Sequence, residues 1–147
     1  VSDMQAAIGC SQLKKLNFFV EKRIKNFNLL KKYLQEKIPN HSDFFHLPQN
    51  LPQATPSWFG FPITLTKGSR KQVVASLEKN KVGTRLLFAG NLTKQPLYQK
   101  SSYRIVGDLK NSDTVMNNTF WVGIHPSLDD QHMEYIAEKI KLAVLEV

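Results

Sequence analysis

The sequence lacks the features that most directly mark a disulfide, metal or membrane protein. It has one cysteine, Cys10, which excludes an internal disulfide and any multi-cysteine metal or iron–sulfur cage made by this chain alone. No apolar run approaches the roughly 18 residues of a membrane span, and no basic segment followed by an apolar stretch opens the chain. We therefore expect no membrane span and a cytoplasmic location. We interpret Cys10 as a small buried residue, because no basic or histidine neighbour is evident to activate it.

Common catalytic motifs are also missing. The sequence contains no G-x-x-x-x-G-K-[ST] loop, no G-x-G-x-x-G turn and no G-x-S-x-G elbow. The spacing of its four histidines commits none of them to a metal or a nucleophile. We therefore predict no metal site and no catalytic residue within this chain.

The composition is that of an ordinary globular domain with an uneven charge. The chain has 147 residues, of which 41% are hydrophobic and 22% are charged, so we expect one domain. Of the net charge of +8, residues 14–37 contribute +6, from eight basic and two acidic side chains. A basic helix of this kind could bind nucleic acid through phosphate contacts. We favour a solvated helix face and no nucleic-acid partner, because no aromatic residues interleave with the lysines on that face.

A long helix is predicted over about residues 3–38. Ser2 and Gln5 have the spacing of a capping box, and Pro39 ends the pattern. One apolar stripe runs along the helix and consists of Leu13, Leu16, Val20, Phe27, Leu30 and Leu34. Arg23 stands where an apolar residue is due, so it either extends to solvent along its own methylenes or pairs with a carboxylate across a packing interface.

A strand and a helix are predicted next. Residues 57–66 alternate between apolar and other positions, which is typical of a strand, with Phe59 on the apolar side. Pro62 cannot donate a ladder hydrogen bond, so we expect an edge strand or a position that faces away from the partner. Gly60 either allows a close approach to the backbone or forms a bulge. Ser69 and Gln72 then predict a capping box for a helix up to about Lys79.

The segment of residues 83–98 begins as a strand and ends as a polar loop. Arg85, Asn91 and Gln95 offer hydrogen-bond donors that suit an anionic or sugar-like partner, although an outward arginine followed by an ordinary surface loop fits the same residues. Further elements are predicted in the order of a short strand at 103–106, a helical turn at 111–115, a central strand at 119–124, and a final helix capped by Ser127 and Asp130. This order predicts an α+β fold in which helices cover a mainly antiparallel sheet.

Several segments together resemble one family. They read SDMQAAIGCSQLKKL at 2–16, PSWFGFPIT at 56–64, VGTRLLFAGNLTKQPLY at 82–98, YRIVGDLKNSD at 103–113 and MNNTFWVGIHPSL at 116–128, with Lys22–Arg23 and Asn26–Phe27 between the first two. The first resembles the start of the C-terminal part of DegT/DnrJ/EryC1/StrS sugar aminotransferases. The others resemble the subgroup of CDP-4-keto-6-deoxy-glucose 3-dehydrases, which deoxygenate sugars in lipopolysaccharide biosynthesis.

The resemblance implies that residues 1–147 form the C-terminal, small domain of a fold-type-I transferase dependent on pyridoxal phosphate (PLP). The long helix would link this domain to an upstream cofactor-binding domain, and the complete protein is expected to be a homodimer. In the subgroup a histidine replaces the usual lysine, so that pyridoxamine phosphate (PMP) stays exchangeable and removes the sugar C3 hydroxyl. The resemblance also implies an upstream iron–sulfur cluster and a flavin/iron–sulfur reductase as partner for the reductase-coupled members. The resemblance places the histidine, the cofactor phosphate loop and the cluster cysteines upstream of this chain.

The resemblance also assigns substrate-binding residues for a CDP-4-keto-6-deoxy-sugar. Arg85, Asn91 and Gln95 stand in the RLLFAGN…QP motif and would face the nucleotide-sugar, while Trp58 and Phe59 would supply apolar surface. Phe59 occupies a position where aminotransferase relatives tend to have histidine, which favours the dehydrase branch. Arg104 and Asn118 are further candidates. An aminotransferase acting on the same sort of sugar is the alternative within the family, and it differs mainly in one upstream residue.

Overall fold

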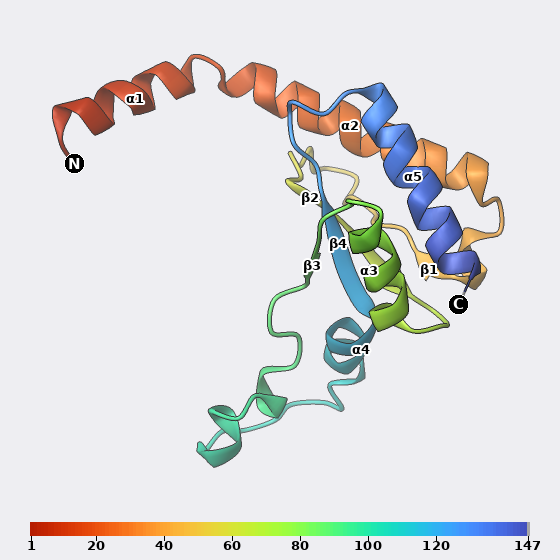
Figure 1. Ribbon diagram of the computed structural model, residues 1–147. Helices are drawn as coiled ribbons and strands as arrows, with labels where there is room; N and C mark the ends of the chain where they lie inside the picture. Colours follow the sequence, from red (N-terminus) through yellow and green to blue (C-terminus); the bar gives the residue numbers. More distant parts are fainter. Residues whose placement is uncertain (147) are drawn as a thin grey trace.

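The structure is a computed structural model, and it describes residues 1–146 (Figure 1). Its helices and strands, in chain order, are α1 (Asp3–Leu13), α2 (Leu16–Lys37), β1 (Phe45–His46), β2 (Gly60–Leu65), α3 (Arg70–Lys79), β3 (Thr84–Leu86), α4 (Lys110–Asn118), β4 (Thr119–Gly123) and α5 (Asp130–Leu145). Short 3₁₀ turns occur at His41–Asp43, Leu92–Lys94 and Tyr98–Lys100. This order of elements confirms the predicted α+β class.

The four strands form one antiparallel sheet in the order β1-β2-β4-β3. β4 therefore lies between β2 and β3, as its apolar sequence predicts. In the register Phe61 faces Val122, Pro62 faces Trp121 and Ile63 faces Phe120. Since cross-strand partners share a sheet face, these pairs divide β2 and β4 into a core face and an opposite face.

Pro62 lies where a missing N–H has no cost. The Ile124 amide donates to the Phe59 carbonyl at 2.8 Å, which makes that pair hydrogen-bonded. Because such pairs alternate along an antiparallel ladder, the Pro62–Trp121 pair is not hydrogen-bonded, and the proline nitrogen faces away from β4. On its other side β1 pairs only with Thr64 and Leu65. The prediction that Pro62 faces away from its partner is therefore confirmed.

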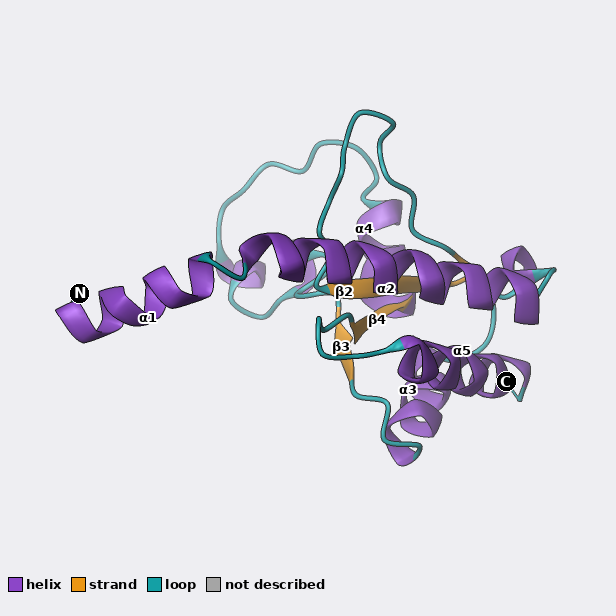
Figure 2. Ribbon diagram, turned by 90° about the horizontal axis from the view of Figure 1, so that it is seen from above, coloured by secondary structure: helices purple, strands orange, loops and turns teal. Residues whose placement is uncertain are grey.

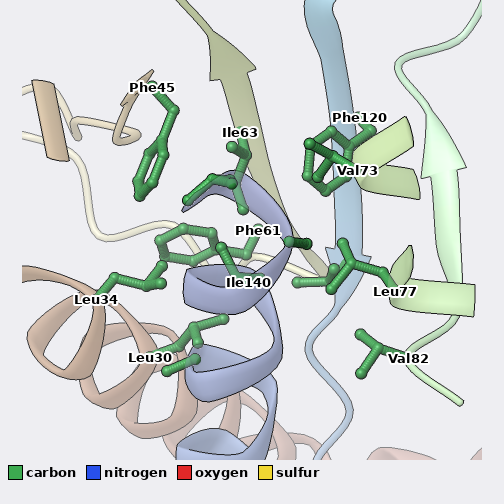
Figure 3. Packing of buried hydrophobic residues seen from close by; sticks show 14 of the residues in the cluster. Leu30, Leu34, Phe45, Phe61, Ile63, Val73, Leu77, Val82, Phe120 and Ile140 are labelled. Atoms are coloured by element: carbon green, nitrogen blue, oxygen red, sulfur yellow. The ribbon is translucent and has the colours of Figure 1, made fainter. Parts of the chain in front are cut away.

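The core lies between one face of the sheet and three helices. Figure 3 shows Phe61 and Ile63 of β2 beside Ile140 of α5, with Leu30 of α2 and Leu77 of α3 close by. All five are buried in one hydrophobic cluster. Along α5 the buried residues are Met133, Ala137, Ile140, Ala143 and Val144. Helices α2, α3 and α5 thus cover the same face of the sheet, and most of the opposite face carries no helix.

The single helix predicted over about 3–38 is divided in two. The Lys15 amide bonds to the Gln12 carbonyl at 2.9 Å, a three-residue spacing, and α2 begins afresh at Leu16. In both views α1 extends away from the body of the domain (Figures 1 and 2). It contains no buried residue, so Cys10 is exposed and the expectation that it is buried is wrong.

Only one of the predicted helix caps has the expected hydrogen bonds. The Ser2–Gln5 capping box is present at the start of α1. Ser69 precedes α3 but makes no side-chain cap bond. Before α5 the cap is Asp129, paired in a capping box with His132, and not Ser127 with Asp130. An aspartate closer to the first buried turn has displaced the serine as the cap.

The connection from β3 to α4 is a long excursion without strands. It leaves the body of the domain and returns at α4 (Figure 1). The short strand predicted at 103–106 is absent from the described residues, because this segment is exposed and no neighbouring strand is there to pair with it. The helical turn predicted at 111–115 is a complete helix, α4, of nine residues.

No helix among residues 1–146 is both long and apolar enough to cross a membrane.

Candidate substrate-facing site

An apolar hollow lies on the sheet face that the three core helices leave open. It has a volume of about 150 Å³, and its lining consists of Trp58, Phe59, Gly60, Pro62, Leu87, Phe88 and Trp121. The indole N–H of Trp58 donates to Asn50 Oδ1 at 2.9 Å, and that of Trp121 donates to the Leu86 carbonyl at 3.2 Å. With both indole donors engaged, the side chains of the lining present apolar surface only. Such a surface suits the carbon-rich face of a ligand.

Gly60 is required for the position of Trp121. A Cβ atom at residue 60 would lie 2.3 Å from Trp121 Cε3 and 2.8 Å from Cζ3. The ring of Trp121 therefore lies directly over the glycine backbone, and it also meets Phe59 edge-on, with 5.2 Å between the ring centroids. The close approach predicted at Gly60 is made by this tryptophan. Phe59 itself precedes β2 and is 57% exposed. The prediction that it lies on the apolar side of the strand is therefore wrong.

Phe88 forms an exposed wall of the hollow in an unusual backbone conformation. It is 81% exposed, and its φ of 50° lies in the left-handed region. Large side chains rarely adopt that region, and such residues concentrate at functional sites. Its amide donates to the Leu86 carbonyl at 2.8 Å, which folds the chain back just after β3.

Arg85 lies next to the hollow, on the same sheet face. It pairs in register with Trp121 and lines a second hollow of about 240 Å³ on the β3 side, together with Thr84, Gly83 and Gly123. Its Nη1 donates to the Thr84 carbonyl at 2.9 Å. The guanidinium is exposed and makes no salt bridge within residues 1–146. It is therefore available to an anion.

Glu78 supports the strand that carries Arg85. Its Oε1 accepts from the Thr84 hydroxyl at 2.8 Å and from the Thr84 amide at 2.6 Å. These two bonds, in that order, hold the pKa of the carboxyl below its ordinary value, and the charge of Arg85 adds to the effect. The arrangement fixes the start of β3 and leaves the Arg85 guanidinium directed away from the core.

Asn91 and Gln95 form hydrogen bonds within the chain. The Asn91 amide nitrogen donates to Asp113 Oδ1 at 2.7 Å, and its oxygen accepts from the Thr93 amide at 3.1 Å and hydroxyl at 2.7 Å. The Gln95 amide donates to the Ala89 carbonyl at 3.1 Å. Both residues lie on the segment that follows Phe88, and neither is part of the lining of the hollow. Their contact with a substrate stays a prediction.

The remaining candidates lie outside the hollow. Arg104 is exposed on the excursion. Asn118 ends α4, and its side chain donates to the Leu65 carbonyl at 3.3 Å. A residue that the sequence did not single out is Arg70, whose Nη1 donates to the carbonyls of Met116 and Thr119. The capping pattern before α3 gave no sign of this role, because the partners come from a distant part of the sequence.

The lysines of α2 are partly paired within the domain. Lys25 bonds to Asp130 at 2.8 Å, and Lys37 lies 3.4 Å from Glu134 and 3.3 Å from Glu138. These contacts reduce the free positive charge on the helix and weaken the nucleic-acid alternative.

Arg23 is half-buried, and its Nε is buried without a hydrogen-bond partner among the described residues.

Comparison with known proteins identifies the family. Residues 1–141, nearly the whole chain, match the DegT/DnrJ/EryC1/StrS aminotransferase family. The chain belongs to this family.

Two relatives within the family show substantial identity. The lipopolysaccharide biosynthesis protein RfbH of Salmonella typhimurium is 46% identical over 144 residues, which are 96% of this chain and 32% of that protein. The dTDP-4-dehydro-2,6-dideoxy-D-glucose 3-dehydratase of Saccharopolyspora spinosa is 41% identical over 95% of this chain and 30% of its own length. The chain therefore spans about a third of the length of these family members.

Solved structures place the domain in the same family fold. The E. coli GDP-4-keto-6-deoxy-D-mannose-3-dehydratase with bound hydrated PLP has a TM-score of 0.76 at 28% identity, over 93% of this chain and 34% of that one. The Helicobacter pylori aminotransferase PseC has a TM-score of 0.82 at 19% identity, over 100% of this chain and 38% of that one, and supports the fold alone. The chain matches about a third of this PLP-dependent aminotransferase-like fold.

The lining of the hollow does not by itself form a PLP site. The phosphate needs backbone donors such as a free helix N-terminus, and the ring nitrogen needs a carboxylate. The lining of the hollow contains neither, and the N-terminus of α5 is occupied by its own cap, Asp129. Within residues 1–146 no group of three or more His, Cys, Asp or Glu could hold a metal ion.

Proposed function

We propose that this chain is the C-terminal portion of a PLP- or PMP-dependent nucleotide-sugar 3-dehydratase, and that it forms the substrate-facing wall of the active-site cleft. The observation that carries the proposal is the pairing of an apolar aromatic hollow with the exposed guanidinium of Arg85 on one open sheet face. A nucleotide-sugar has carbon-rich ring faces and a diphosphate. The hollow suits the first and Arg85 the second.

The identities of the relatives support dehydration over amino transfer. RfbH and the Saccharopolyspora 3-dehydratase are 46% and 41% identical to this chain. The dTDP-4-dehydro-2,3,6-trideoxy-D-glucose 4-aminotransferase of the same organism is 26% identical over 97% of the chain. The similarity to RfbH supports a role in the synthesis of deoxysugars for lipopolysaccharide. The CDP-4-keto-6-deoxy-glucose type of substrate that we propose rests on the motif resemblance.

Within the reaction, this chain's own residues would bind the substrate and exclude water. Trp58, Phe59 and Trp121 would cover one side of the sugar, and Arg85 would hold the diphosphate so that the C3 hydroxyl is presented to the cofactor. The cofactor, bound by the upstream part of the protein, supplies the chemistry that removes this hydroxyl. Water is kept out by the apolar lining, because the indole donors already have partners.

The remaining parts of the proposal concern the complete protein. We expect a homodimer in the cytoplasm. An iron–sulfur cluster would require cysteines outside this chain, since Cys10 is its one cysteine. A flavin/iron–sulfur reductase is the partner that we propose for a protein with such a cluster. Visible absorbance of the complete protein tests for the cluster.

The test of the proposed reaction is product analysis with the complete protein. The protein is incubated with PMP, a reductant and CDP-4-keto-6-deoxy-glucose, and the sugar is analysed by mass spectrometry. A dehydratase removes the C3 oxygen, whereas an aminotransferase leaves that oxygen and replaces a keto oxygen with nitrogen. Loss of the C3 oxygen supports the proposal. An amino sugar that retains it would establish the aminotransferase alternative.

A further inference from the structure

The loop after β3 is bonded to α4 through a side-chain pair of one buried and one partly exposed residue. Asn91 is 3% exposed, and its amide nitrogen donates to Asp113 Oδ1 at 2.7 Å. The other carboxylate oxygen of Asp113 lies 2.8 Å from Lys94 Nζ. Lys94 and then Asn91 hydrogen-bond the ionised carboxyl and hold the pKa of Asp113 below its ordinary value. One carboxylate on α4 therefore binds two residues of the loop.

A second contact, one helical turn along α4, holds the same loop by its backbone. Asp113 and Met116 are three residues apart and so lie on the same side of the helix. Gly90 packs against Met116 so closely that a Cβ atom at residue 90 would lie 2.4 Å from the Met116 Cβ. The φ of Gly90 is +63°, a conformation that glycine adopts without strain. The loop thus lies directly on one side of α4.

Helix α4 is in turn fixed to the body of the domain. The guanidinium of Arg70 donates to the carbonyls of Met116 and Thr119 at the end of α4. The Asn118 side chain donates to the Leu65 carbonyl of β2 at 3.3 Å. A loop held by α4 is therefore held in place relative to the sheet.

We propose that Asn91 and Asp113 are positioning residues, which hold the loop of residues 87–95 on α4 and thereby place Phe88 and Leu87 as a wall of the hollow. In this proposal Asn91 acts through Phe88, three residues earlier, in place of the direct substrate contact that its sequence motif predicts. Asn91 is buried and makes three hydrogen bonds within the chain, whereas Phe88 is exposed and lines the hollow. The inference rests on the proposed function for its effect on catalysis, but the hold on the loop can be measured independently.

A reciprocal exchange of the pair tests the proposal in the complete protein. The Asn91 amide nitrogen lies 2.7 Å from Asp113 Oδ1, so Asn91→Asp places a second carboxylate beside that of Asp113. The two carboxylates repel each other. The double variant N91D/D113N restores an amide–carboxylate bond with donor and acceptor exchanged. We expect N91D to lose about ten- to a hundred-fold in kcat/KM, mainly through KM, as for the loss of a charge-assisted hydrogen bond. We expect the double variant to recover most of that loss.

Hydrogen exchange supplies a second readout, and Asn111→Asp supplies the matched control. Asn111 is an exposed residue of α4, so N111D adds the same charge without touching the loop. Amides of residues 87–95 should exchange faster in N91D, should recover in the double variant and should be unchanged in N111D, with α5 unaffected in all three.

Two results would overturn the proposal. If the double variant is as impaired as N91D while the loop exchanges normally, the Asn91 amide contacts the substrate directly. If N91D loosens the loop without changing KM or kcat, the pair is structural only. Should the wild-type protein turn over no nucleotide-sugar, the proposed function fails, and exchange of residues 87–95 still decides whether the pair holds the loop.

Discussion

The contact between Gly60 and Trp121 gives the sharpest structural prediction. A Cβ atom at residue 60 would lie 2.3 Å from Trp121 Cε3, whereas ordinary contacts begin at 3.4 Å. In Gly60→Ala the indole ring must therefore move by about an ångström or more. That movement breaks its bond to the Leu86 carbonyl, which is 3.2 Å long, and its edge-on contact with Phe59. Overpacking of this kind costs about 1–3 kcal/mol, and we expect G60A to lower the free energy of unfolding by that amount.

Gly123 offers a matched control, because it is the register partner of Gly60 and has nothing within 4 Å of its own Cβ position. Gly123→Ala should leave the stability unchanged or raise it by up to about 1 kcal/mol. Urea denaturation of the 147-residue chain, followed by circular dichroism, measures both variants. Tryptophan fluorescence should change in G60A and stay the same in G123A.

A double-mutant cycle shows whether Trp121 is the cause. With Trp121→Ala as background, the cost of G60A should fall below about 0.5 kcal/mol, since the obstructing ring is gone. If G60A lowers the free energy of unfolding by the same amount in the Trp121→Ala background, a contact other than that with Trp121 causes the destabilisation. Wild-type stability and fluorescence in G60A itself would show that the ring does not lie over Gly60.

Four further predictions concern the site and the helices. Arg85→Ala in the complete enzyme should lower kcat/KM for the CDP-sugar about ten- to a hundred-fold, or about 1.5–3 kcal/mol, with cofactor binding retained; full substrate affinity would make Arg85 structural. The pKa of Asp113 lies below its ordinary 3.8, mainly because of Lys94, so its stabilisation is present above that pH and is lost as pH falls through the lower folded-state pKa. The stability difference between wild type and Asp113→Asn should therefore shrink as pH falls below 3.8, and a constant difference would contradict this. Amides of α1 should exchange fastest among the helices of the isolated chain, because α1 has no buried residue, and uniform protection over residues 4–37 would speak against that. The isolated chain should show no saturable PLP or PMP absorbance at micromolar concentration, since half a cleft exposes both partners to water.

The sequence predicts those elements whose burial is set by their own periodicity. The aromatic and β-branched run of β4 indicated a central strand, and the spacing of Met133, Ala137 and Ile140 predicted the buried side of α5. Pro62 was placed correctly because a missing N–H restricts its position whatever the neighbours are. In each case local chemistry leaves few alternatives.

Other features depend on residues far apart in the sequence and could not be predicted in this way. Asn91 suits a ligand as well as a turn, and only the packing of α4 shows that Asp113 is its partner. The break between α1 and α2 falls at two lysines, which are good helix formers and carry no stop signal. At the start of α5, Ser127 and Asp129 are both suitable caps, and the buried face of the helix selects the second.

The claim that the open sheet face binds a nucleotide-sugar is tested most directly by a structure of the complete protein with the CDP-sugar bound. The account predicts the sugar in contact with Trp121 and Phe59, and the diphosphate within about 3 Å of the Arg85 guanidinium. A nucleotide-sugar bound elsewhere, with this face buried against another part of the protein, would contradict it.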